Sequence, residues 1–192
     1  MTDIADRPTA GRPPWSGPAG TPDGYSPFPA EAVDGSIGDR LREVADQHGD
    51  RPALRGPDGH YTHAELWSTV QERALALAER VEGDDPAAVA LLTSHDAGQV
   101  VDLLAVVTAG HAALVLDPTA PPELNRTLLD DASAAVLICD EAHDAAAREL
   151  AGGQVPVVGV GDLTGAEGTL PDDGHLSAGE LPGGRVVGLV AD

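Results

Sequence analysis

AAVALLTS (residues 87–94) opens the stretch that decides the fold of this 192-residue chain. It reads as a buried strand, and it is followed by a largely apolar helix over 97–110 and a second strand, AALVLD, over 112–117. A near-continuous apolar run is typical of a strand that is covered on both faces. Because a helix separates two such strands, the stretch predicts a parallel pair and hence an α/β fold.

The same alternation continues on both sides of this stretch. Downstream, we expect helices over 121–132 and 141–150 and strands over 134–139 and 155–160. Upstream, we expect a helix that is capped by Ser36 and reaches His48, then two short strands over 53–55 and 60–62. The whole pattern predicts a largely parallel sheet with helices on both faces.

A capping box is the sharpest local signal in the chain. In Thr62-His63-Ala64-Glu65, the threonine hydroxyl and the glutamate carboxylate can each accept from the other's amide at a helix start. The apolar stripe that follows comprises Leu66, Val70, Ala74, Leu77 and Val81. This spacing predicts an amphipathic helix, and its solvent face would carry Glu72, Arg73, Glu79 and Arg80.

Composition divides the chain into four segments. Residues 1–30 are crowded with Pro, Gly, Ser and Thr, so we expect an extended or disordered lead-in. The α/β subdomain occupies 31–161, and an acidic, Gly-rich surface loop occupies 162–184. Residues 185–192, RVVGLVAD, read as a terminal strand. A strand needs neighbours for its backbone groups, so this segment predicts a continuation or a partner.

Charge and residue usage exclude several classes of function. The 32 acidic and 11 basic residues give a net charge of −21, which disfavours binding to nucleic acid or to an anionic membrane. All of the basic residues are arginine, so the chain has no lysine for a Schiff base or a phosphate contact. No signal-peptide or membrane-spanning segment is recognisable, and we expect a cytoplasmic protein.

No motif completes a catalytic set. Gly159-Val160-Gly161 lacks the third glycine of a dinucleotide loop, because position 164 is Thr164. Ser94-His95-Asp96 has the residue types of a triad, but sequence neighbours cannot converge as one, so we expect a loop with a helix cap. His60 and His63 have no further ligands for zinc. Cys139 lies in an apolar run and reads as a buried hydrophobe.

Several segments together resemble the beginning of the adenylate-forming, AMP-binding ligases, most of all nonribosomal peptide synthetase adenylation domains, and also acyl-CoA synthetases. YTHAEL (61–66) resembles their first core motif, with His63 where tyrosine is usual. LLAVVTAGHAALVLDPTAPPE (103–123) resembles the second core motif, and Leu124 replaces the arginine that commonly follows. The resemblance covers roughly residues 25–160.

This resemblance implies the first, incomplete subdomain of the adenylate-forming large domain. Its matched residues carry structural roles only: Thr62, Glu65, Leu66, Gly110, Asp117 and Pro118. In the family, the phosphate loop, the substrate pocket and the acyl-transfer lysine all come later in the sequence. We therefore expect no catalytic, cofactor-binding or metal-binding residue here, and ATP and Mg²⁺ are implied only for a complete enzyme.

Three hypotheses about function remain open at this point. The leading one is the N-terminal part of a ligase that adenylates an amino acid or another carboxylate with ATP, passes the acyl group to a thiol, and is inactive alone. Its partner would be the missing remainder of the adenylation domain, either in the same chain or, as in a split enzyme, in a second chain. A carrier protein would be a further partner. The other two are a degenerate adenylation-like domain that acts as a non-catalytic scaffold, and a small independent α/β binding protein.

Overall fold

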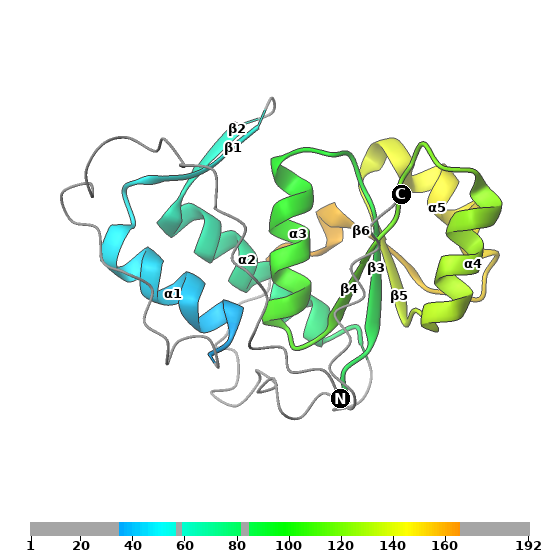
Figure 1. Cartoon of the computed structure of the whole chain (residues 1–192), viewed down its shortest axis with the longest axis horizontal. Coiled ribbons are helices and arrows are strands. Elements are labelled where there is room, and N and C mark those ends of the chain that lie inside the picture. The colour runs from blue at the N-terminus through cyan, green and yellow to red at the C-terminus, as the bar shows by residue number, and fades with distance from the viewer. Residues whose placement is uncertain (1–34, 57–58, 82–84, 166–192) are drawn as a thin grey trace, which may run out of the picture. The chain divides into compact units, whose positions relative to one another are not determined.

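A computed structural model describes residues 35–56, 59–81 and 85–165 (Figure 1). The expected lead-in over 1–30, the loop beyond Gly165 and the strand over 185–192 lie outside the described residues. Within the described part, no helix is both long and apolar enough to cross a membrane.

A parallel sheet forms the centre of the described part. Its strands are β3 (Ala88–Leu92), β4 (Ala112–Val115), β5 (Val136–Cys139) and β6 (Val157–Gly159). They pair in the order β4-β3-β5-β6, and every pair is parallel. The predicted α/β class is therefore confirmed.

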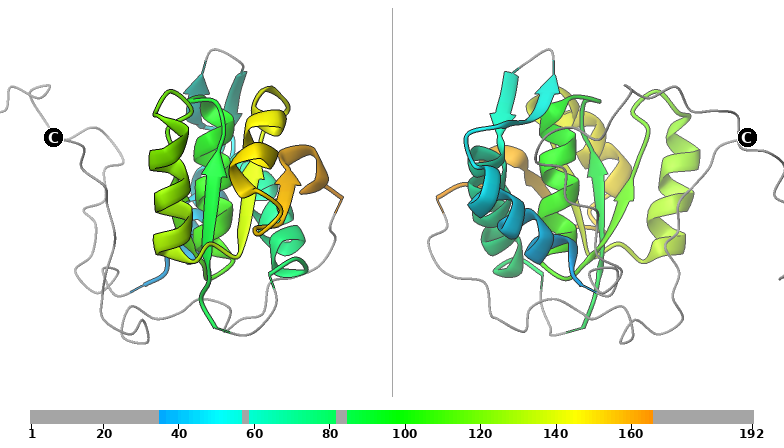
Figure 2. Two further views of the ribbon diagram at one scale, coloured as in Figure 1. Left: turned by 90° about the vertical axis from the view of Figure 1, so that its right-hand side faces the viewer. Right: turned by 60° about the vertical axis from the view of Figure 1, so that its left-hand side comes forward.

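Helices connect these strands across both faces of the sheet. The α-helices are α3 (Ala97–Thr108), α4 (Pro122–Ala132) and α5 (Asp144–Ala151), and short 3₁₀ turns occur at η3 (Glu141–His143) and η4 (Val160–Asp162). Figure 2 shows α3 on one side of the sheet and α4 and α5 on the other. The helix predicted over 141–150 is thus divided, because its first turn is a 3₁₀ turn capped by Asp140.

Alternate strand residues separate the core into two apolar clusters. Val89 and Leu91 of β3 point to the face covered by α2 and α3, whereas Ala90 and Leu92 point to the face of α4 and α5. Strand β5 repeats this alternation, and Leu137 and Cys139 pack with the α4/α5 cluster. Both faces are buried, which explains why the strands read as continuous apolar runs.

The N-terminal elements form a third packed unit beside α3. They are α1 (Ile37–His48), the antiparallel hairpin of β1 (Pro52–Gly56) and β2 (Gly59–Thr62), and α2 (His63–Ala78). Leu66 and Val70 of α2 pack against Val101 of α3 and form the centre of this cluster. At Gly56 an added Cβ would lie 2.9 Å from the Ala97 Cβ, so this glycine lets the hairpin approach α3 closely.

One sequence expectation is wrong here. Arg73 was expected on the solvent face of its helix, but its side chain is mostly buried and forms an ion pair with Asp102 of α3. Asp102 is 2% exposed, and its burial raises the pKa of its carboxyl, an effect that Arg73 only partly offsets. The reason for the difference is tertiary: α3 packs along the side of α2 that carries Arg73.

Candidate functional site at the carboxyl edge of the sheet

Polar side chains gather where three of the parallel strands end. The segments concerned are 93–96 after β3, 117–119 after β4 and 140–143 after β5. The chain leaves β3 toward the α3 face and leaves β5 toward the α5 face (Figure 2). Neighbouring strands with opposite exits define a topological switch point, the place where open α/β sheets bind ligands. This edge is therefore the candidate functional site.

A carboxylate joins the ends of β3 and β5 at this switch point. The backbone amide and the hydroxyl of Ser94 both donate to Asp140 Oδ2, at 2.8 and 2.7 Å. The other oxygen, Oδ1, accepts from the His143 amide at 3.0 Å and lies 2.5 Å from His143 Nδ1. Burial alone would raise the pKa of Asp140, but these bonds outweigh it and the net pKa is lowered.

The order of these three groups does not match a catalytic triad. In a triad the imidazole stands between the hydroxyl and the carboxylate and removes the hydroxyl proton. Here Asp140 stands between Ser94 and His143, and the serine hydroxyl donates to the carboxylate. Asp96, the third member of the sequence motif, instead caps α3 by accepting from the Gln99 amide at 3.1 Å. The cluster is therefore a polar clamp between two loops.

The end of β4 forms a tight turn at Asp117. The Asp117 carboxylate accepts from the amide and the hydroxyl of Thr119, both at 2.7 Å. These bonds lower the pKa of Asp117, and the charge of nearby His95 contributes to the same shift. The turn is tied to α4 because the Asn125 side-chain amide donates to the Asp117 carbonyl oxygen at 2.8 Å. Asn125 is buried, and its Oδ1 has no hydrogen-bond partner among the residues that the structure describes.

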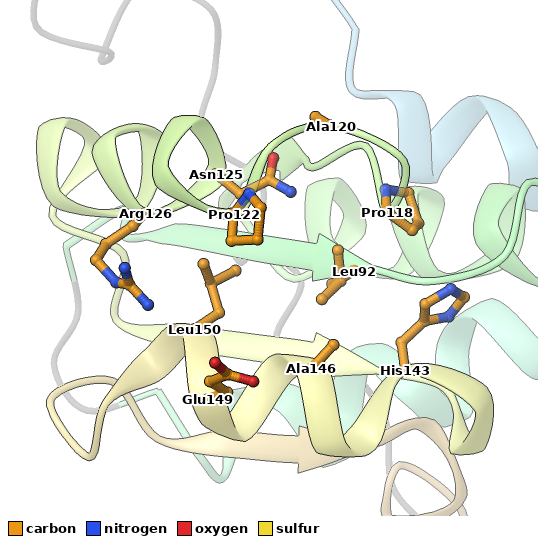
Figure 3. Close-up of a pocket in the computed structure, with 10 residues that line it drawn as sticks. All are labelled: Leu92, Pro118, Ala120, Pro122, Asn125, Arg126, His143, Ala146, Glu149 and Leu150. Atoms are coloured by element: carbon orange, nitrogen blue, oxygen red, sulfur yellow. The ribbon is translucent and has the colours of Figure 1, made fainter.

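A small pocket lies between α4 and α5 next to this turn (Figure 3). Its volume is about 90 Å³, and Leu92 and Leu150 contribute to its apolar lining. His143 and Pro118 lie at the end toward which the strands point, and Arg126 and Glu149 lie toward the other end. Pockets that hold drug-sized ligands measure roughly 300–1,000 Å³. This one is far smaller, so it cannot enclose a nucleotide.

The remaining motif residues are placed as local structure. Both hydrogen bonds of the capping box are present: Thr62 Oγ1 accepts from the Glu65 amide at 3.3 Å, and Glu65 Oε2 accepts from the Thr62 amide at 2.8 Å. Leu66 is buried in the third cluster. Gly110 follows the end of α3 with a φ of 84°, in the left-handed region that favours glycine. Pro118 lines the pocket at the Asp117 turn.

Other candidate chemistry from the sequence does not converge. Among the described residues, no three His, Cys, Asp or Glu side chains lie close enough together to hold a metal ion, and His60 is exposed. Cys139 is buried, and desolvation raises the pKa of its thiol. Gly159 and Gly161 belong to the end of β6 and the η4 turn.

Sequence reasoning missed the clamp, although one part of its signal was visible. Asp140 directly follows a buried strand, and in a parallel sheet such a residue lies near the end of each neighbouring strand. Ser94 lies two residues after the end of β3. What the sequence does not contain is the strand order, which makes β3 and β5 neighbours although β4 lies between them along the chain.

Comparison with known proteins now assigns the chain to a family. The model of the AMP-binding enzyme family matches residues 41–180, and the chain belongs to that family. It is 36% identical over 123 residues to isonitrile lipopeptide synthase of Streptomyces coeruleorubidus, which covers 64% of this chain and 8% of that protein. It is 33% identical over 129 residues to N-(5-amino-5-carboxypentanoyl)-L-cysteinyl-D-valine synthase of Amycolatopsis lactamdurans, covering 65% of this chain and 3% of that protein.

Solved structures agree with this assignment at the level of the fold. The N-terminal subdomain of Klebsiella oxytoca NpsA matches with a TM-score of 0.63 and 21% identity, over 74% of this chain and 35% of that chain. o-Succinylbenzoate CoA synthetase from Bacillus subtilis matches with a TM-score of 0.59 and 22% identity, over 67% and 33%. The chain thus has the fold of the N-terminal subdomain of adenylate-forming enzymes and spans a small fraction of its curated relatives.

Proposed function

We propose that this chain is the N-terminal part of an AMP-forming ligase of the nonribosomal peptide synthetase type. The complete enzyme would join a carboxylate to the α-phosphate of ATP with loss of pyrophosphate. A thiol would then take the acyl group from the adenylate and release AMP. The observation that carries this proposal is the family match over residues 41–180, within which both core-motif segments adopt ordered structure.

The described residues support a structural rather than a chemical role within that enzyme. Thr62 and Glu65 start a helix, Gly110 ends one, and Asp117 shapes a turn. The pocket at the carboxyl edge is too small for ATP, and the chain has no lysine to serve in acyl transfer. We therefore propose that adenylation needs further polypeptide, either continuous with this chain or supplied as a second chain.

ATP–pyrophosphate exchange with a panel of amino and aryl acids tests this proposal. The chain would be assayed alone, fused to the later part of an adenylation domain, and mixed with that part as a separate polypeptide. We expect exchange only in the combined samples. Exchange by the chain alone would contradict the proposal. Circular dichroism of each sample would show that an inactive protein is folded.

The scaffold hypothesis gives a different result in the same assay. The residues that depart from the family pattern, His63 and Leu124, lie at the start of α2 and on α4. If they mark a degenerate domain, exchange would be absent in every combination. The double variant His63→Tyr/Leu124→Arg would then also show no exchange.

Intact-mass measurement of the native protein from its source cells, captured by an antibody to residues 36–160, would show whether the remainder is in the same chain.

A further inference from the structure

One edge of the parallel sheet is open within the described residues. Strand β4 is first in the strand order and pairs only with β3. The Ala112 amide donates to the carbonyl oxygen of Ala87, just before β3, and the Leu116 amide donates to that of Leu91 in β3, both at 2.9 Å. Because backbone groups alternate in direction along a strand, the amides of Ala113 and Val115 point away from β3. A row of unpaired backbone groups of this kind is a template for another strand.

Apolar side chains surround the carboxyl end of this edge. Val115 of β4 is 38% exposed, Val100 of α3 is 40% exposed, and Leu124 of α4 is 51% exposed. The only other large hydrophobic side chain that is exposed in the described part is Ile37, on α1. We call Val100, Val115 and Leu124, together with the outer edge of β4, the β4 edge surface.

Helix geometry places Val100 and Leu124, like Val115, beside the same edge of the sheet. Val101 and Asp102 of α3 contact α2, and Val100 lies on the flank of α3 that is turned away from that contact. Pro122 and Arg126 of α4 face α5 across the pocket (Figure 3). Leu124 lies about 160° around the helix from each of them, on the other flank. Val100 and Leu124 therefore lie on the flanks of α3 and α4 next to β4, and the α4 flank also carries the exposed polar residues Thr127 and Asp131.

The composition of α3 agrees with a covered flank. Its only charged residue is Asp102, which is buried against Arg73. A helix that borders solvent normally carries charged or polar residues on its free side. On α3, the exposed Val100 is followed two turns later by the half-buried Val107. The space beside β4 therefore has an apolar wall on the α3 side, Leu124 on the α4 side, and outward-pointing backbone groups between them.

We propose that residues 185–190 of this chain, RVVGLV, occupy the β4 edge surface as an additional strand parallel to β4. Their near-continuous apolar run suits a strand that is covered on both faces, as α3 and α4 would cover it. Residues 1–34, which include the lead-in, contain no comparable run of β-branched residues. At the opposite edge of the sheet, none of the described residues beside β6 is an exposed large hydrophobic.

The connecting segment is long enough for this arrangement. Residues 166–184 lie between the last described residue and the proposed strand. A parallel connection needs about a dozen residues or more, and this segment can extend to roughly 60 Å. A sheet of four strands is only about 15 Å across, at about 4.8 Å for each strand spacing.

Cysteine crosslinking in the full chain tests the proposal. Val115→Cys would be combined in turn with Val186→Cys, Val187→Cys, Gly188→Cys, Leu189→Cys and Val190→Cys, and each protein would be oxidised at low concentration. Native Cys139 is buried and should not compete. Because Val115 ends its strand, a parallel neighbour should give an intramolecular disulfide with a residue late in the run, at least tenfold above background. Ile37→Cys in place of Val115→Cys is the control, since Ile37 is also an exposed large hydrophobic residue, 56% against 38%, and lies on α1.

Each other outcome overturns the proposal. Disulfide-linked dimers whose yield rises with protein concentration would place a second copy of the chain on the β4 edge surface. A preferred crosslink to position 186 would indicate an antiparallel strand. Crosslinking no greater than that of the Ile37→Cys control would mean that residues 185–190 do not dock there. Hydrogen exchange supplies a second readout, because the Ala113 and Val115 amides should be protected in the full chain and lose that protection in Val187→Asp/Leu189→Asp.

Discussion

Ser94 and Asp140 lie 46 positions apart in the chain, yet the amide and the hydroxyl of Ser94 both donate to one Asp140 carboxylate oxygen. This contact holds the loop after β3 against the loop after β5. We expect Asp140→Ala to reduce the free energy of unfolding by about 1–3 kcal/mol, because it removes the acceptor of a partly buried amide. Urea denaturation would measure the change. Glu141→Ala, an exposed neighbour, should stay within about 0.5 kcal/mol of the parent.

The same carboxylate predicts a dependence of stability on pH. The pKa of Asp140 is lowered in the folded protein, so its ionised form stabilises the fold above the unfolded pKa of about 3.9. That contribution is lost as the pH falls through the lower pKa of the folded state. The stability difference between the parent and Asp140→Asn should therefore be constant near neutral pH and shrink below about pH 4. A difference that grows on acidification would contradict this assignment.

The buried ion pair between Arg73 and Asp102 can be tested by a double-mutant cycle. Asp102→Leu should destabilise the protein by about 3–5 kcal/mol, because it leaves a buried guanidinium without its partner. Adding Arg73→Met should recover most of that loss, since an apolar pair of similar size can replace a buried ion pair. Additive losses in the double variant would mean that the two side chains act independently. Thermal and urea unfolding would give the four stabilities.

The capping box at Thr62 should contribute a measurable part of the stability. Thr62→Ala removes the acceptor for the Glu65 amide and should cost about 1 kcal/mol. Thr62→Ser keeps the hydroxyl and should restore nearly the parental stability. Equal losses in the alanine and serine variants would show that the threonine methyl group, rather than the cap, is responsible.

Gly110 should tolerate substitution less well than an unconstrained glycine. Its φ of 84° would place an alanine in the left-handed region, at a cost of roughly 1–2 kcal/mol. Gly161 is the matched control, because an added Cβ there meets no atom within 4 Å and its φ is not in that region. The denaturation midpoint of Gly110→Ala should fall while that of Gly161→Ala stays near the parent. Equal midpoints would remove the conformational argument.

Local signals explain how much of the fold the sequence predicts. The strands of the sheet, the helices between them and the caps at Ser36, Thr62 and Asp96 each depend on residues within one or two turns of one another. Hydrophobic periodicity and capping patterns report such short-range preferences directly. The family resemblance adds the turn at Asp117 and the helix end at Gly110.

Long-range polar pairs explain what the sequence does not predict. Arg73 and Asp102 are 29 positions apart, and nothing near Arg73 distinguishes it from a solvent-facing residue. The available signal was on the other side of the pair, because a single acidic residue in an otherwise apolar helix indicates a buried position. The contact of Ser94 with Asp140 likewise needs the strand order, which periodicity does not contain.

Two of the three apolar clusters of the core each contain a natural reporter. Trp67, the only tryptophan in the described residues, packs with the cluster formed by α1, α2 and α3. Cys139, the only cysteine of the chain, is buried among the residues under α4 and α5. In a Trp15→Phe background, fluorescence follows the N-terminal cluster and thiol labelling follows the α4/α5 face of the sheet. Coincident unfolding curves would show that the hairpin-bearing N-terminal elements and the parallel sheet unfold as one cooperative unit.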